Sequence, residues 1–222
     1  MRIDHVIIGS RTLVEIRDLL RDTHGFGLVE GSAHEDGTKG WLVPFDSPDV
    51  QYLEVLVPGD QRQLTADAFG TYFLEATADG PAFLGWAVHT EEIEKDAARV
   101  AELTGADPKL LQGESVRADG RRFPWAEAAF ELAWRSPSRP FFLRYGNTEA
   151  RRERVPGDLV RAGHRTTPLA YAGIAVGTAG LDLAAWCGGH ELPVTQRPST
   201  RECVEAVRIT TGAGTTTLEL PC

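Results

Sequence analysis

The sequence repeats one local pattern three times along its 222 residues. Each copy begins with a short alternating strand and a small or hydroxyl residue, continues as an amphipathic helix, and ends at glycine. The copies are DHVIIGSRTLVEIRDLLRDTHGFG (4–27), GWAVHTEEIEKDAARVAELTG (85–105) and AGIAVGTAGLDLAAWCGG (172–189). A repeated unit constrains the fold more than any single motif, because every copy has a similar apolar face to bury.

Local chemistry supports a helix in each copy. Thr12 and Glu15 have the spacing of a capping box at the start of the first helix. Gly105 is a typical terminator for the second helix. The third helix is predicted to be short, from about residue 181 to 187, because two glycines follow it.

Three strand-like segments follow each predicted helix. They are GLVEGSAH, TKGWLVPF and VQYLEVLVP in the first unit, ESVRADG, FPWAEAAFELAW and PFFLRYG in the second, and ELPVTQRP, CVEAVRITTG and TTTLELP in the third. Asp119 and Gly120 form a hairpin-type turn signal in the second unit. Each unit is therefore predicted to be a β-α-β-β-β module of α+β class, and such modules should pair to cover their sheet faces.

The predicted organisation is a pair of modules, a linker and a third module. Residues 1–147 hold module one (about 1–60) and module two (about 82–147), with a connecting helix in 65–80; residues 148–167 form a polar linker and residues 168–222 the third module. Three modules leave one without a partner. It either extends the paired domain or pairs with a second chain, and we expect a homodimer because an uncovered apolar face is costly in water.

Charge and hydropathy exclude several classes of partner. With 23 basic and 32 acidic residues, the net charge of −9 argues against nucleic acid as a partner. The apolar runs are too short to cross a membrane and no leader segment is recognisable, so a cytoplasmic protein without membrane partners is expected. Because no glycine-rich phosphate loop is present, we expect no nucleotide cofactor.

The three cysteines offer no recognisable framework. Cys187, Cys203 and Cys222 are odd in number and irregular in spacing, without a CxxC pair. The prediction is three reduced thiols, with neither a disulfide nor a zinc cluster.

Two strands carry one metal-capable side chain each where alternation points it inward. They are RIDHVIIGS with His5 and QYLEVLVPG with Glu54. An imidazole and a carboxylate could hold a divalent ion. Alternatively, His5 is hydrogen-bonded to Asp4 and Glu54 pairs with Arg144.

An ordered set of motifs resembles a known family. The set is IDHVIIGS, GSAHEDGTKGWLVPF leading into QYLEVLVP, AFLGWAVHTEEIE, VRADGRRFPW, PFFLRYG and a final GH before the third unit. It is similar to the glyoxalase-like branch of the vicinal oxygen chelate superfamily, over roughly residues 1 to 150 and more weakly to the end. The resemblance implies tandem modules forming curved mixed sheets, with metal ligands on the first and last strand of each module.

The resemblance maps the ligand positions of module one onto His5 and Glu54. In module two, the matching positions hold Trp86 and Arg144, which cannot bind a metal here, so a site divided evenly between the two modules is excluded. In the third module, Glu219 in TTLELP stands where Glu54 stands and is an additional carboxylate candidate.

His34 is the third ligand candidate, because the glyoxalase-like branch often has a histidine in the setting GSAHEDG. His5, His34 and Glu54 would resemble the two-histidine, one-carboxylate set of open metal sites. Alternatively, His34 is a turn residue that touches substrate or solvent. His89 should face away from Trp86 and is interpreted as a surface residue.

Four further side chains are candidates for substrate binding. Trp41, Trp86 and Trp125 could line an apolar cleft, and Arg144 could receive a carboxylate or phosphate. Their alternative roles are core packing for the tryptophans and neutralisation of Glu54 for the arginine. Arg117 and Asp119 are interpreted as hairpin residues, and no catalytic residue is identified.

Two functions of different classes follow. The first is a divalent-metal-dependent enzyme of lyase, isomerase or dioxygenase type, with Zn, Fe, Mn or Ni as the ion, acting on a small oxygen-rich metabolite. The alternative is a metal-free protein that binds or sequesters a small molecule, as resistance proteins of this fold do. Neither the substrate nor the reaction follows from the sequence.

Overall fold

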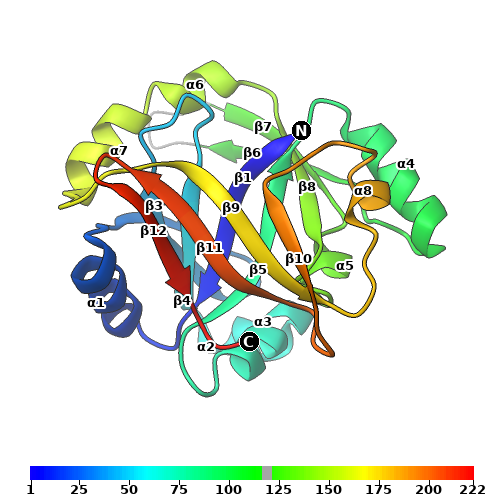
Figure 1. Ribbon diagram of the computed structural model, residues 1–222, viewed down its shortest axis with the longest axis horizontal. Helices are drawn as coiled ribbons and strands as arrows, with labels where there is room; N and C mark the ends of the chain where they lie inside the picture. The colour runs from blue at the N-terminus through cyan, green and yellow to red at the C-terminus, as the bar shows by residue number, and fades with distance from the viewer. Residues whose placement is uncertain (117–121) are drawn as a thin grey trace.

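The computed structural model describes residues 1–116 and 122–222, which form two β-sheets with helices around them (Figure 1). The eight-stranded sheet has the order β2-β3-β4-β1-β5-β8-β7-β6, and the four-stranded sheet has the order β10-β9-β11-β12. The strands of the larger sheet are β1 (Arg2–Gly9), β2 (Val29–Ala33), β3 (Thr38–Pro44), β4 (Tyr52–Pro58), β5 (Ala82–His89), β6 (Leu111–Val116), β7 (Arg122–Ala128) and β8 (Pro140–Tyr145). Those of the smaller sheet are β9 (Pro168–Thr178), β10 (Val194–Pro198), β11 (Cys203–Thr211) and β12 (Gly214–Glu219). The predicted hairpin residues Arg117, Asp119 and Gly120 lie outside the described residues.

Several of the helices begin or end at capping residues that the sequence marks. They are α1 (Leu13–His24), α2 (Gln61–Ala66), α3 (Ala68–Ala76), α4 (Ile93–Thr104), α5 (Phe130–Trp134), α6 (Thr148–Arg152), α7 (Val155–Ala162) and α8 (Leu183–Trp186). The Thr12 side chain accepts a hydrogen bond from the Glu15 N–H, as a capping box requires. Gly105 ends α4 with a φ of 67°, in the left-handed region that glycine adopts without strain.

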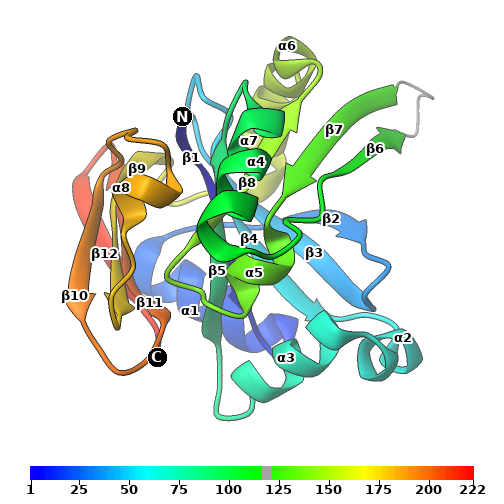
Figure 2. The ribbon, with the colours of Figure 1, turned by 90° about the vertical axis from the view of Figure 1, so that its right-hand side faces the viewer.

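Modules one and two share the larger sheet. Their first strands, β1 and β5, run antiparallel at its centre, and each first strand lies parallel to the last strand of its own module, β4 or β8. Strands β2 and β3 lie at one end of this sheet, and β6 and β7 lie at the other (Figure 2). The expected fold class, tandem modules forming curved mixed sheets, is confirmed.

The third module repeats the order of elements but not the order of strands. Its first strand, β9, pairs in parallel with β10 and antiparallel with β11, and β12 follows at the sheet edge. In module one the last strand lies beside the first, whereas here β11 separates them. Glu219 on β12 is exposed and pairs in register with Ala206, so it does not occupy the place that Glu54 has in module one.

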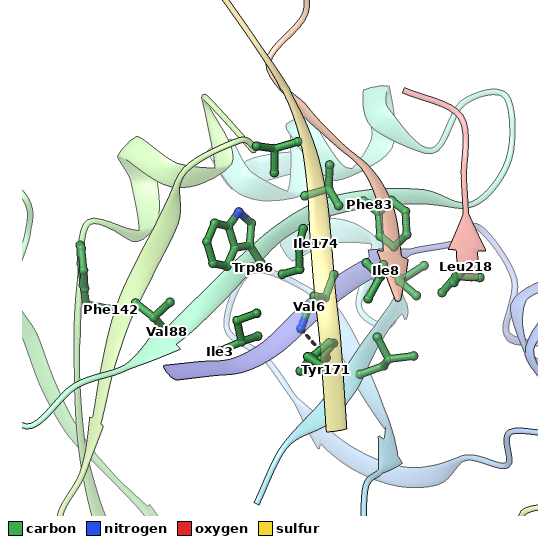
Figure 3. Close-up of a cluster of buried hydrophobic side chains, with 14 of the residues drawn as sticks. Ile3, Val6, Ile8, Phe83, Trp86, Val88, Phe142, Tyr171, Ile174 and Leu218 are labelled. Carbon is green, nitrogen blue, oxygen red and sulfur yellow. Dashed lines mark hydrogen bonds between the residues drawn. The ribbon is translucent and has the colours of Figure 1, made fainter. Parts of the chain in front are cut away.

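The smaller sheet packs against the larger one within the same chain. Val6, Ile8 and Trp86 on the larger sheet share one buried cluster with Ile174 and Leu218 on the smaller (Figure 3). The Tyr171 hydroxyl accepts a hydrogen bond from the Val6 N–H across this interface, at 3.0 Å. The apolar face of the third module is therefore covered in its own chain. The homodimer was expected because an apolar sheet face would otherwise be exposed to water. The structure removes that reason, and the homodimer stays a prediction.

Two segments differ in secondary structure from the expectation. FPWAEAAFELAW was expected to be one strand, but β7 ends at Ala128 and α5 begins at Phe130. Ala129 turns the chain between them with a φ of 64°. The segment expected to be a polar linker holds α6 and α7, and one of its arginines, Arg151, is buried.

The prediction of three free thiols is wrong. Cys203 and Cys222 form a disulfide whose Cα atoms are 5.9 Å apart, and only Cys187 is a free cysteine. Spacing along the chain could not show this pair, because β12 returns along β11 and brings the C-terminal tail back to the start of that strand.

No helix in the described ranges 1–116 and 122–222 is both long enough and apolar enough to cross a membrane.

Candidate functional site

The candidate site lies on the inner face of the larger sheet, which we define as the face carrying His5, Tyr52, Glu54 and Phe141. The opposite, outer face carries Val6, Ile8 and Trp86 and is covered by the smaller sheet (Figure 3). The pairing of β1 with β5 shifts register between Ile3 and His5. Such an irregularity breaks the strict alternation of a strand and re-aims side chains, which brings Asp4 beside His5.

His5 is fixed by contacts on several sides. Its Nδ1 lies 2.9 Å from Asp4 Oδ1, its ring stacks on Tyr52 at 4.7 Å, and Phe141 meets it edge-on at 5.6 Å. The side chain is almost wholly buried. The imidazole is therefore held in one orientation, with Nε2 as its remaining polar atom.

Asp4 is completely buried and has three polar partners. Arg151 Nη1 lies 3.3 Å from Oδ2, and the Tyr145 hydroxyl donates to Oδ1 at 3.3 Å, where His5 is also bound. Burial alone would raise the pKa of this carboxyl, but Arg151 and the hydrogen bond with His5 outweigh burial and hold the pKa well below its usual range. Asp4 is thus an acceptor, and the hydrogen of the bond belongs to His5 Nδ1.

His34 is oriented by the turn that follows β2. Its Nδ1 lies 3.1 Å from Thr38 Oγ1, and that hydroxyl donates its own hydrogen to Asp36 at 2.6 Å. Because a hydroxyl has one hydrogen, Thr38 accepts from His34, and Nδ1 carries the hydrogen here too. Gly40 leaves the imidazole room, since a Cβ there would lie 3.4 Å from its Cε1 and Nε2.

Glu54 lies between the two imidazoles. Its Oε2 is 3.4 Å from His5 Nε2, and its Oε1 is 3.8 Å from His34 Nε2. A second carboxylate, Glu127 on β7, is within electrostatic range of all three side chains. Burial raises the pKa of Glu127, His5 and His34 lower it, and Glu54 raises it. The structure therefore brings together the three residues predicted as ligands and adds a carboxyl group from module two.

The donor atoms of this group fit a divalent ion by type. Both imidazoles have Nδ1 engaged as a donor, so each leaves Nε2 to face the Glu54 carboxylate. An unprotonated Nε2 and a carboxylate oxygen repel each other unless a proton or a metal ion lies between them. Among the described residues, no group of three or more His, Cys, Asp or Glu side chains is already arranged as a metal cluster.

The four predicted substrate-binding residues do not lie together. Trp125 pairs in register with Tyr145 on the inner face and packs over Gly113. Trp41 pairs with Val55, and its ring packs against the core of the outer face. Trp41 is therefore remote from His5.

Trp86 and Arg144 also lie on the outer side of the sheet. Trp86 pairs with Val6, because the register sets Ala87, and not Trp86, opposite His5. Arg144 forms a bidentate ion pair with Glu94 of α4 at 2.5 and 2.7 Å. An offset of one residue reverses the face of a strand side chain, which is why alignment by strand ends misplaced both.

His89 is not a surface residue, contrary to the expectation. It is 1% exposed, its ring stacks on Tyr145 at 6.0 Å, and its Nε2 has no hydrogen-bond partner. Burial lowers its pKa, and nearby Arg2 adds to the effect. It belongs to the buried surroundings of Asp4.

The hydrogen bond between His5 and Asp4, stated as the alternative for His5, is present. Four other contributors to the site were missed in the sequence: Tyr52, Glu127, Tyr145 and Arg151. Tyr52 lies two residues before Glu54, and strand alternation could have placed both on one face. Arg151 belongs to the basic run ARRERV, which gave no sign of burial. Only the folded chain brings it to Asp4.

A family model described as "Glyoxalase-like domain" matches residues 3–187. The chain belongs to this family. The match confirms the resemblance to the glyoxalase-like branch of the vicinal oxygen chelate superfamily. No curated protein matches the glyoxalase-like chain.

Several solved structures are similar to this glyoxalase-like protein. A hypothetical protein from Staphylococcus aureus has 15% identity and a TM-score of 0.62, over 93% of this chain and 89% of its own, which shows the shared fold. Methylmalonyl-CoA epimerase from Mycobacterium tuberculosis has 16% identity and a TM-score of 0.39, over 65% of this chain and 86% of its own. The Streptomyces coelicolor epimerase in complex with 2-nitronate-propionyl-CoA has 18% identity and a TM-score of 0.43, over 67% and 96%.

Proposed function

We propose that this glyoxalase-like protein is a divalent-metal-dependent enzyme that moves a proton on a small oxygen-rich molecule. The observation that carries the proposal is the position of Glu54, whose two carboxylate oxygens each face the Nε2 of a histidine. His5, His34 and Glu54 would hold the ion. When bound, the ion would act as a Lewis acid toward a substrate oxygen and leave positions open for it.

Glu127 is the proposed proton carrier. It lies on β7, within electrostatic range of His5, His34 and Glu54, and burial is the largest effect on its pKa and raises it. A carboxyl group with a raised pKa suits general acid–base chemistry near neutral pH. Among the lyase, isomerase and dioxygenase types, this residue favours the first two, because their reactions need a side chain that gives and takes a proton.

Trp125 supports binding of the organic part of a substrate. It lies two positions from Glu127 on the same strand, so the two side chains share the inner face. An indole beside a carboxyl group offers an apolar wall next to a polar centre, as small-molecule sites require.

Metal content and affinity test the proposal. Purified protein is titrated with Zn²⁺, Mn²⁺, Ni²⁺ and Co²⁺ by calorimetry, and one bound ion per chain is expected. His5→Ala, His34→Ala and Glu54→Gln should lose this stoichiometric binding while keeping the far-ultraviolet circular dichroism of the parent. If the parent chain binds none of the four ions, the proposal is overturned.

Two control variants match the chemistry of these changes. His190→Ala removes an exposed histidine, and Glu219→Gln removes an exposed carboxylate on the other sheet. Both should bind the ion like the parent. Weaker binding in Glu219→Gln would instead assign Glu219 a place among the ligands.

A metal-free binding function is the second candidate. It is favoured by the His5–Glu54 and His34–Glu54 contacts, which can form without an ion if the imidazoles are protonated, and by the lack of a ready metal cluster among the described residues. In that case the tryptophan fluorescence would respond to a ligand equally in the parent, His5→Ala and Glu54→Gln proteins, and Trp125→Phe would remove the response.

Glu127→Gln separates binding from proton transfer. The variant should retain the ion and lose the exchange of carbon-bound hydrogen with deuterated water, measured by NMR on a panel of small hydroxycarbonyl compounds. Exchange at the parental rate in this variant would exclude Glu127 as the proton carrier.

A further inference from the structure

His5 has two ring nitrogens, and only one of them faces Glu54. A neutral imidazole carries one hydrogen, on either Nδ1 or Nε2, and a metal binds the nitrogen without it. What determines the tautomer is therefore the hydrogen bond at the other nitrogen, which here is the bond from Nδ1 to Asp4 at 2.9 Å.

The Asp4 carboxylate has no freedom to leave this bond. Its Oδ2 is held by Arg151 Nη1 at 3.3 Å, and Tyr145 donates to its Oδ1 at 3.3 Å. The Arg151 guanidinium lies 3.4 Å from the centre of the Tyr145 ring, so these partners also pack on each other. Arg151 comes from α6, in the segment between the second and third modules.

We propose that Asp4 is a positioning residue, which Arg151 holds so that His5 carries its hydrogen on Nδ1 and presents Nε2 toward Glu54. The inference rests on the proposed metal-dependent function, since Nε2 is the atom that would bind the ion. It adds that α6 takes part in building the site, although α6 lies outside the two modules that form the sheet. Carboxylates that orient metal-bound histidines in this way are typical of metal sites.

The substitution Asp4→Asn reverses the hydrogen bond with few steric consequences. Arg151 only donates hydrogen bonds, so the Asn carbonyl oxygen would face Arg151 and the NH₂ group would face His5. His5 Nδ1 would then accept, and the ring hydrogen would move to Nε2. The nitrogen that faces Glu54 would no longer be a free ligand.

Nitrogen NMR of the imidazole tests the tautomer directly in metal-free protein. Long-range ¹H–¹⁵N spectra, recorded at a pH at which the ring is neutral, should show the hydrogen on Nδ1 in the parent chain and on Nε2 in Asp4→Asn. A neutral parental His5 with its hydrogen on Nε2 overturns the proposal. This measurement needs no variant, so it remains decisive if Asp4→Asn does not fold.

Metal affinity gives the second readout. Asp4→Asn should bind Zn²⁺ about tenfold to hundredfold more weakly than the parent, the usual effect of losing such a partner. Asp96→Asn is the matched control, because Asp96 is also buried and paired with an arginine, Arg99, but lies on α4 outside the inner face. It should bind Zn²⁺ like the parent.

The outcomes separate the two proposals. If the parent binds no ion but His5 carries its hydrogen on Nδ1, the metal-dependent function fails and the role of Asp4 in orienting His5 stands. If the parent binds Zn²⁺ and folded Asp4→Asn binds it equally well, the function stands and the positioning role is overturned.

Discussion

The ion pair between Arg151 and Asp4 is almost completely removed from water, unlike the pair formed by the neighbouring Arg152. Side-chain exposures are 8% and 0% for Arg151 and Asp4, but 45% and 76% for Arg152 and Glu149. A charge left without its partner in the interior is far more costly than one left at the surface. Two adjacent arginines therefore have very different consequences for stability.

We expect Arg151→Met to lower the free energy of unfolding by about 3–5 kcal/mol, because it leaves the Asp4 carboxylate buried and unpaired. Arg152→Met should change it by less than about 1 kcal/mol. Urea denaturation followed by circular dichroism measures both. Similar small losses in the two variants would show that water reaches Asp4.

Side chains of the site were predictable from the sequence to different degrees. His5 and Glu54 were found because each interrupts an apolar strand, and His34 because of its motif. Glu127 was overlooked because its strand lies far from the other three in sequence. Trp86 and Arg144 were assigned to the wrong face by one residue, which strand alternation turns into a full reversal.

At the scale of elements, His164 joins α7 to module one. Its Nδ1 accepts from the Gly27 N–H at 2.9 Å, and its Nε2 lies 3.0 Å from the Pro44 carbonyl oxygen, to which it can only donate. The bond from Gly27 requires the neutral ring, because a protonated Nδ1 cannot accept a hydrogen bond. Burial lowers the pKa of His164, and the bond to Pro44 opposes this in part.

Stability should therefore decline on acidification. Because the folded pKa lies below the unfolded value of about 6.5, the neutral His164 stabilises the fold fully above that pH, and the contribution is lost as pH falls through the folded pKa. His24 and His89, whose pKa values burial also lowers, act with the same sign. Thermal melting at about pH 7.5 and pH 5 should show a smaller difference in His164→Gln, which can make both bonds without titrating. An unchanged difference would exclude His164 as a contributor.

The disulfide is a second connection between elements. It ties the tail after β12 to the first residue of β11. Cys222→Ser should lower the free energy of unfolding by about 2–4 kcal/mol. Alkylation in denaturant, read by mass spectrometry, should label one thiol before reduction and three after it. Labelling of all three without reduction would contradict the bond.

For the whole molecule, the two sheets should unfold together. Ile209 on β11 is fully buried in the cluster that also contains Val6 and Trp86 of the larger sheet. Ile209→Ala should cost about 2–5 kcal/mol and shift a single unfolding transition. Tryptophan fluorescence and circular dichroism should give the same midpoint. Two separate transitions, with only one of them shifted, would show that the third module folds independently.

The sequence by itself determined most of the elements and their order along the chain. Helical and strand periodicity, a capping box and terminal glycines are local signals, and they located the three copies of the module and the two strands that carry His5 and Glu54. Local signals suffice because a helix or strand buries one face whatever it packs against.

Only the tertiary structure determined which side chains and which sheet faces lie against each other. The strand order of the third module differs from that of modules one and two, and its apolar face is covered within the chain. Strand register placed Trp86 and Arg144 away from the site. Arg151 reaches Asp4 from 147 positions along the chain. Contacts over such separations depend on how all the elements pack, which is why no short stretch of sequence reveals them.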